Sequence, residues 1–130
     1  MEASELRIGN WITDFGDGYG KVTDILLAGD DYDIGTTANS VCQPIETFTP
    51  IKLTPEILEA AGFEKEKEVW KGVSRHFLFP VTVQIDDSGN IGVYVAGGGN
   101  AEHIKHLHQL QNLFYSLTSQ ELEIKIPATA

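Results

Sequence analysis

Apolar residues recur with a helical period over residues 100–118, the longest periodic run in the chain. At 100° per residue, one arc of this run carries Ile104, Leu107, Leu110, Gln111, Phe114 and Leu117. The opposite arc carries Lys105, Gln109, Asn112 and Ser116. The pattern predicts an amphipathic helix over 100–118. Because so wide a stripe must be covered, it also predicts a β-layer on which the helix packs.

Alternating apolar residues predict strands in most of the remaining chain. A short strand at 5–13, bent at Gly9, and a strand at 21–28 are expected to form an N-terminal hairpin of the SH3-like kind. A third short strand is expected near 32–34. Residues 38–53 contain two prolines, which favours an extended edge segment over a central strand.

The second half of the chain predicts an antiparallel meander. Its strands are expected at 69–73, 75–85 and 91–97, with a hairpin turn at 86–90. One face of the second strand would carry Phe77, Phe79, Val81, Val83 and Ile85, with Pro80 outside that face. The charged segment 64–68 predicts a solvated loop, and the alternation at 121–126 predicts a final strand.

The segment 54–62 predicts a short helix between these two halves. Thr54 suits the N-cap, Pro55 the first helical position and Gly62 a left-handed residue after the end. Two turns are not stable alone, so this helix is expected to dock on a sheet. The predicted fold class is therefore α+β in a single domain, 1–130. Residues 1–53 form an SH3-like β lobe, and residues 54–130 form the short helix, the antiparallel meander, one long C-terminal helix and the final strand.

Charge and cysteine content narrow the classes of partner. The chain has 9 Lys plus Arg against 19 Asp plus Glu, a formal net charge of -10. It would repel duplex nucleic acid and anionic membranes, although screening over roughly 8–10 Å leaves room for a local anion pocket. A single cysteine, Cys42, allows no internal disulfide. With neither a secretion signal nor an apolar run of about 18–20 residues, a cytoplasmic protein is expected.

Glycines precede the predicted long helix. Gly97, Gly98 and Gly99 follow a predicted strand and lead to Asn100. Free N–H groups and the positive dipole end of a helix can bind phosphate or carboxylate there. The run lacks the Lys-Ser/Thr of a P-loop and the spacing of a dinucleotide fingerprint. The alternative is a plain loop in which Asn100 caps the helix.

Three histidines lie close together in the sequence but do not converge on a helix. His103 and His106 fall within the apolar arc, whereas His108 falls on the other side. At most two of them could share an ion, with His76 as a further ligand, and no HExxH motif is present. We therefore predict no metal site and no cofactor. His103 and His106 are either satisfied polar groups or donors to an anion beside the glycine loop.

No catalytic set is recognisable. The chain has no GxSxG motif, no paired acids on adjoining strands and no nucleophile with a base at known spacing. Asp86 belongs to a predicted turn, and the acidic loop at 30–33 lacks the later ligands of a calcium loop. Cys42 is expected to be a packed side chain. We predict no catalytic residues, with a small hydrolase or a metal protein as the least favoured class.

A few aromatic and cationic side chains suit an anionic ligand that carries a ring. Trp11, Tyr19 and Tyr94 are candidates for stacking on a base, and Arg75 and Lys105 for holding phosphate. The alternative for each aromatic residue is a place in the core.

Three segments together resemble a family of small phage and prophage proteins of Bacteroidetes-type gut bacteria. They are ELRIGNW (5–11), PIKLTPEILEAAGF (50–63) and HLHQLQNLFYSLTSQELEI (106–124). The resemblance covers about a third of the chain, and its most specific part is 108–117. Ser119 stands where the family pattern has glycine. The resemblance supplies no catalytic residues to transfer.

The resemblance implies a phage-encoded accessory protein acting in the host cytoplasm. Small acidic phage proteins often counter bacterial immunity, and one class sequesters nucleotide signals, usually between subunits. By this analogy the leading hypothesis is a non-enzymatic protein that binds a small anionic ligand such as a cyclic or modified nucleotide, with a homo-oligomer left open. The alternative is a protein–protein adaptor or inhibitor that acts through an acidic surface.

Overall fold

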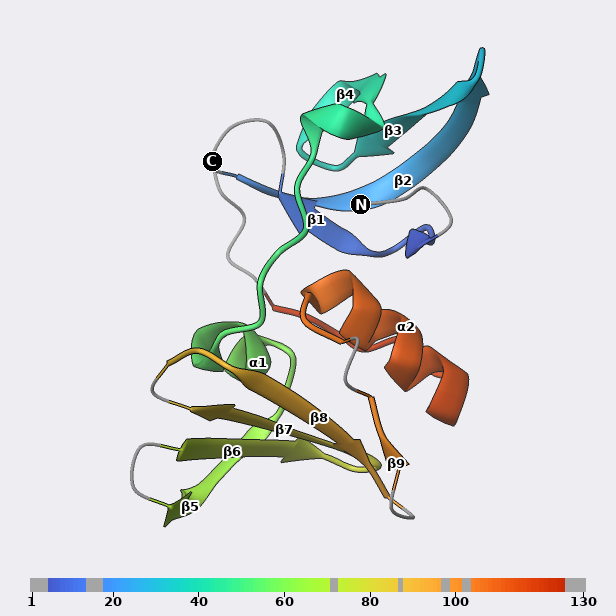
Figure 1. Cartoon of the computed structure of the whole chain (residues 1–130). Coiled ribbons are helices and arrows are strands. Elements are labelled where there is room, and N and C mark those ends of the chain that lie inside the picture. Colours follow the sequence, from blue (N-terminus) through green and yellow to red (C-terminus); the bar gives the residue numbers. More distant parts are fainter. Residues whose placement is uncertain are drawn as a thin grey trace. The chain divides into compact units, whose positions relative to one another are not determined.

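The computed structural model describes residues 5–13, 18–70, 73–86, 88–96, 99–101 and 104–125. Its elements, in chain order, are β1(Trp11–Thr13), β2(Tyr19–Ala28), β3(Asp31–Thr36), β4(Asn39–Pro44), the 3₁₀ turn η2(Ile45–Thr47), α1(Pro55–Ala60), β5(Glu64–Trp70), β6(Val73–Leu78), β7(Val81–Asp86), β8(Ile91–Val95), β9(Gly99–Asn100) and α2(Leu107–Thr118) (Figure 1). The fold is α+β with two antiparallel sheets. An SH3-like form for the N-terminal lobe stays a prediction.

The chain divides into two compact units. Unit 1 contains Met1–Ile51 and His106–Asn112, and unit 2 contains Lys52–Lys105 and Leu113–Ile126. Helix α2 therefore supplies its first residues to unit 1 and its last residues to unit 2. Neither helix in the described part of the chain has the length and apolar content needed to cross a membrane.

Unit 1 contains the four-stranded sheet β1-β2-β3-β4. Its core consists of Leu6, Ile12, Val22, Ile34, Ile45 and Phe48. The predicted first strand is shorter than expected: Gly9 has a φ of 98°, and a turn between Arg7 and Asn10 precedes β1. The segment after β3 forms β4 at the sheet edge, which confirms the extended edge segment predicted from its prolines.

Side chains of α2 bind the N-terminal segment within unit 1. Gln111 Oε1 accepts a hydrogen bond from Trp11 N at 2.7 Å, and its Nε2 donates to Gly9 O at 3.0 Å. Asn112 Oδ1 accepts from Arg7 Nε at 2.7 Å and from Asn10 Nδ2 at 3.0 Å. The segments 5–11 and 106–112 thus meet in one polar network.

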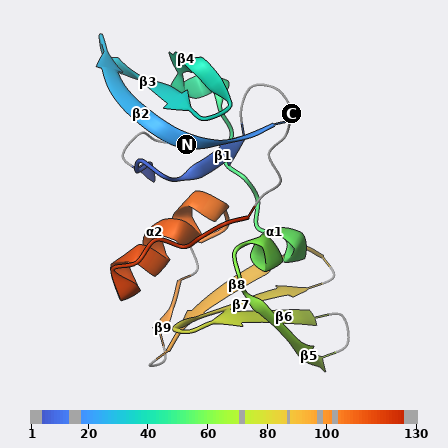
Figure 2. The same cartoon turned by 180° about the vertical axis from the view of Figure 1, so that it is seen from behind.

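Unit 2 contains the five-stranded sheet β5-β6-β7-β8-β9, with α1 on one face (Figure 2). The predicted caps of α1 are confirmed. Thr54 accepts from Ile57 N, Pro55 begins the helix, and Gly62 has a φ of 88°. Leu58 of α1 is fully buried, as docking of an amphipathic helix requires.

Three secondary-structure predictions for unit 2 are wrong: one loop and two strands. The charged segment 64–68 is part of strand β5, because an edge strand exposes one side and tolerates charged side chains. The run 75–85 is two strands, since the chain turns at Phe79-Pro80 and pairs Leu78 with Val81. Residues 121–125 form no strand; Leu122 is buried, and Lys125 N donates a hydrogen bond to Ala60 O at 2.8 Å.

The long helix begins seven residues later than predicted, at Leu107 instead of Asn100. Asn100 pairs with Tyr94, and Ala101 N donates to Val93 O at 2.8 Å, so this part of the chain joins the sheet. The helix starts where the Gln109 side chain accepts from His106 N, which is one half of a capping box. Leu117, expected on the buried arc, is 42% exposed.

Candidate ligand-binding face

Two rows of side chains line the face of the unit 2 sheet that turns away from the core. Cross-strand neighbours share a face, so Phe77, Thr82 and Tyr94 form one row. Arg75 and Gln84, with Gly92 beside them, form the next row. The intervening residues His76, Val83 and Val93 point the other way and are buried. We call Arg75, Phe77, Thr82, Gln84 and Tyr94 the binding face.

The ring of Tyr94 lies along the sheet over Gly92. A Cβ atom built on Gly92 would lie 3.1 Å from the Tyr94 hydroxyl and 3.2 Å from a ring carbon. The missing side chain at Gly92 therefore provides the space in which the tyrosine ring rests. Tyr94 remains 41% exposed, so its ring is both positioned and accessible.

A hollow of about 530 Å³ opens over this face. The binding face lines it together with Phe79, Pro80, Val81, Val95 and Ala96. Phe79 is 81% exposed at the turn between β6 and β7. The hollow thus combines aromatic rings with the guanidinium of Arg75 and the amide of Gln84, which suits a planar, polar ligand.

A second hollow of about 410 Å³ adjoins the other side of Tyr94. It is lined by Ile91, Gly92, Val93, Tyr94, Asn100 and Lys105. Lys105 Nζ donates to Ile91 O at 3.0 Å, which fixes a positive charge at the edge of β8. Tyr94 therefore lines both hollows, one together with Arg75 and the other together with Lys105.

A third hollow in unit 2 has the opposite charge. It measures about 550 Å³ and lies beside the end of α1, where Glu59, Glu121 and Glu123 outnumber Lys125. Such a rim disfavours an anion. For an anionic ligand, the binding face is the better candidate.

The residues predicted for a single site are divided between the two units. Arg75, Tyr94, Gly99, Asn100 and Lys105 all belong to unit 2. Trp11, Tyr19 and His106 belong to unit 1, where Trp11 and Tyr19 are half-buried in β1 and β2. Gly97, Gly98 and His103 lie outside the described residues.

The predicted anion site at the start of the long helix is not formed as expected. Gly99 and Asn100 form β9 and pair with Val95 and Tyr94, so a strand and not a helix follows the glycines. Pairing with β8 satisfies the backbone N–H and C=O groups of these residues. At the start of a helix that begins with glycines, the same groups would be bonded only to water. Asn100 nevertheless lines the hollow beside Tyr94.

The histidines serve packing within the described part of the chain. His108 is buried, contrary to the prediction, and its Nε2 lies 3.2 Å from Glu5 Oε1. A carboxylate only accepts, so Nε2 carries the proton of this hydrogen bond. Burial lowers the pKa of His108, although Glu5 acts in the opposite direction. The His106 ring stacks on that of His108 with centroids 6.1 Å apart.

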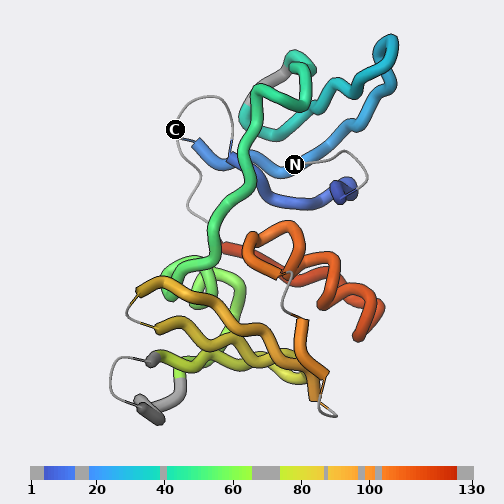
Figure 3. Tube along the Cα trace, in the orientation of Figure 1, coloured from blue at the N-terminus to red at the C-terminus, as the bar shows by residue number. Residues whose placement is uncertain are grey.

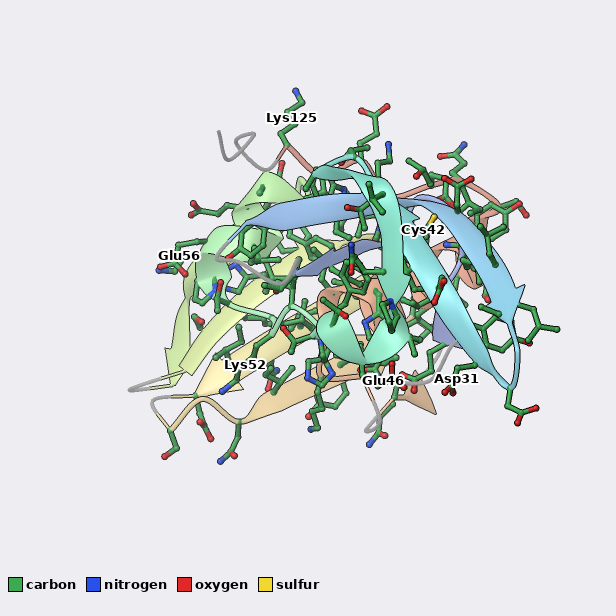
Figure 4. All side chains as sticks on the ribbon, turned by 90° about the horizontal axis from the view of Figure 1, so that it is seen from above. Asp31, Cys42, Glu46, Lys52, Glu56 and Lys125 are labelled. Atoms are coloured by element: carbon green, nitrogen blue, oxygen red, sulfur yellow. The ribbon has the colours of Figure 1, made fainter. Side chains whose placement is uncertain are left out.

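Neither a metal site nor a catalytic set stands out among the described residues. They contain no group of three or more His, Cys, Asp or Glu side chains placed to hold a metal ion. Asp86 is engaged by its own turn: hydrogen bonds from Asn90, and secondarily from Ser88 and Gly89, hold the pKa of its carboxyl below the ordinary range. Cys42 lies on β4 with its sulfur over Gly35 (Figure 4).

Sequence reasoning missed Phe77, Phe79 and Gln84 as residues of this face. It placed Phe77 and Phe79 with Val81 on one buried face, because alternation was carried through Pro80 as if the strand were continuous. The turn at Pro80 reverses the chain, so Phe77 points outward while Val81 points inward. Proline's missing N–H was the available signal for ending the strand there.

Comparisons of this chain with protein-family models, curated proteins and solved structures found no match.

Proposed function

We propose that this protein binds, without turnover, a small anionic ligand that carries a planar ring, and that the ligand lies on the binding face. The observation that supports this most directly is the Tyr94 ring resting over Gly92 beside Arg75 and Gln84 in an open hollow. An accessible ring of this kind can stack on a base, and a guanidinium forms bidentate contacts with phosphate.

Two cations can hold an anion here by direct contact in a chain of net charge -10. Arg75 lines one hollow beside Tyr94, and Lys105 lines the other. Glu66 and Glu64 on β5 are the cross-strand neighbours of Arg75 and Phe77, so the anion would be held by charge-assisted hydrogen bonds to the two cations and not by a positive local field. Gln84 adds an amide that can donate to and accept from the edge of a ring.

Within this ligand class we favour a cyclic or modified nucleotide, and a counter-defence role in which the protein sequesters an immune signal. This step depends on the resemblance to phage proteins and on the pairing of a stacking ring with phosphate-binding cations. A ligand with two bases would match Tyr94 on one side and Phe77 or Phe79 on the other.

The test is calorimetry with cyclic dinucleotides, cyclic trinucleotides and mononucleotides on the full chain and on Tyr94→Ala. We expect one member of the panel to bind and Tyr94→Ala to weaken it by roughly tenfold or more, since stacking contributes about 1–3 kcal/mol per base. Gly92→Ala should also weaken binding, because the new Cβ displaces the ring.

Tyr32→Ala is the matched control, an equally exposed strand tyrosine in unit 1. It should leave the affinity unchanged. Equal affinity of Tyr94→Ala and the parent chain would remove the binding face from consideration. Recovery of a hydrolysed ligand from the complex would contradict binding without turnover.

A further inference from the structure

The hairpin of β2 and β3 continues beyond the core of unit 1. Ile34 is fully buried and Ile25 packs against the core. The two strands then remain paired through Leu26↔Asp33, Leu27↔Tyr32 and Ala28↔Asp31 to the turn at Gly29. Figure 3 shows this hairpin extending past the ends of β1 and β4. We call residues 25–34 the arm.

The arm carries an apolar row that is exposed in the described part of the chain. Leu27 and Tyr32 are cross-strand neighbours on the same face as Ile25 and Ile34, so they continue the core face outward. Leu27 is 67% exposed and Tyr32 39%. Leu26, on the reverse face, is 52% exposed. Large aliphatic side chains clustered on one exposed hairpin indicate an interaction surface.

The charge around the arm has a single sign. Residues 22–51 contain no Lys or Arg, and their carboxylates are Asp24, Asp30, Asp31, Asp33 and Glu46. Asp31 flanks the turn of the arm (Figure 4), and Asp33 is paired with Leu26. A partner that covers the apolar row must therefore offer cations to the rim.

One edge of the arm is also open within the described residues. β1 pairs with β2 at Tyr19–Lys21, and the last backbone hydrogen bonds from the segment before β1 reach Val22. Beyond Val22, the backbone of β2 on that side meets no strand in the described part of the chain. An open strand edge beside an apolar row can add an extended segment from another chain.

We propose that the arm is a docking surface for an extended segment of another protein in which aliphatic and basic side chains alternate. The aliphatic side chains would cover Leu27 and Tyr32, and the basic ones would face the rim carboxylates. A second copy of this chain is disfavoured as the occupant, because two arms would bring carboxylates of like charge together. The proposal is independent of the binding face, which lies in unit 2.

Fluorescence anisotropy with a short labelled peptide of alternating Val and Lys tests this on the full chain. We expect binding that weakens with added salt, and no binding of the matched Val and Glu peptide. Leu27→Asp should weaken the Val and Lys peptide by roughly tenfold or more, because it places a charge in the apolar row. Asp31→Asn combined with Asp33→Asn should weaken it as well.

Leu117→Asp is the matched control, since it introduces the same change at an exposed leucine of unit 2. It should leave peptide binding intact. A melting temperature close to the parent value shows that Leu27→Asp still folds, and Leu27→Ser serves as the second variant if it does not. No peptide binding, or equal loss with Leu27→Asp and Leu117→Asp, would overturn the proposal. Self-association of the parent chain that Leu27→Asp abolishes would also overturn it and assign the arm to a second copy.

The two sites have separable outcomes. Tyr32→Ala should weaken the peptide and spare the nucleotide, whereas Tyr94→Ala should do the reverse. Failure of one proposal therefore leaves the other standing.

Discussion

At the scale of single residues, Gln111 illustrates how a polar side chain can belong to a core. It is 1% exposed, and its amide satisfies both the N–H of Trp11 and the carbonyl of Gly9. Sequence periodicity placed Gln111 on the buried arc, which is confirmed, but placed Asn112 on the solvent side. The structure shows Asn112 half-buried and bonded to Arg7, Asn10 and the backbone of Glu5.

We expect Gln111→Leu to destabilise the protein although it adds apolar surface. The substitution removes the side-chain partner of Trp11 N and of Gly9 O, which are part-buried, and an unsatisfied group shielded from water costs about 1–3 kcal/mol. Urea denaturation of the full chain measures the change. Gln120→Leu, at an exposed position after α2, should shift the free energy of unfolding by no more than about 0.5 kcal/mol. Equal effects at the two positions would show that the Gln111 network contributes nothing.

At the scale of elements, α1 and α2 differ in how clearly their sequences mark the ends of the helix. Thr54, Pro55 and Gly62 mark both ends of α1, and each residue acts where local chemistry predicts. The start of α2 lacks a Ser, Thr or Asp cap and is marked only by Gln109 reaching back to His106. Because the sequence has no strong local signal for the start of α2, its apolar period can be followed back to Asn100. In the structure Asn100 pairs with β8 instead, and the helix begins at Leu107.

Removing the cap of α1 should have a measurable cost. Thr54→Ala deletes the acceptor for Ile57 N and should lower the free energy of unfolding by about 1 kcal/mol. Denaturant melts followed by circular dichroism would report it. Thr23→Ala provides the control, because that exposed hydroxyl donates its hydrogen bond to the carboxylate of the adjacent Asp24 and caps no helix. An unchanged midpoint for Thr54→Ala would mean that docking on the sheet alone holds the helix.

At the scale of the whole molecule, each unit contains one buried histidine with a lowered pKa. Burial is the main cause for both; for His76 of unit 2 the second cause is Lys65, while Glu5 partly offsets it for His108 of unit 1. In each ring Nδ1 is buried and has no hydrogen-bond partner within the described part of the chain. Just below the ordinary imidazole pKa, these two side chains therefore stay neutral in the folded state, whereas the same histidines in the unfolded chain are protonated.

Stability should therefore fall as the pH drops below about 6.5, the ordinary imidazole value. Below that value the unfolded state binds more protons than the folded state, so the free energy of unfolding decreases with decreasing pH. Above it both states are neutral and these two groups contribute no slope. Calorimetric melts from pH 8 to pH 5 test this, and His76→Met should reduce the acid slope. A slope identical in His76→Met and the parent chain would exclude His76 as a source.

Much of this molecule was determined by its sequence alone. Local chemistry is sufficient for α1, for the turn at Asp86 and for strand β8 after it, because caps, turn residues and period two act within a few neighbours. Only the tertiary structure decided where α2 begins, that residues 64–70 form a strand, and which face Phe77 occupies. These outcomes depend on pairing with chain segments distant in sequence, and neither the free energy of that pairing nor its register is encoded in any short window. For the same reason the sequence allows a choice of candidates by residue type, namely Arg75, Tyr94 and Lys105. Only the pairing of the strands shows that Gly92, Gln84 and Phe79 lie beside them.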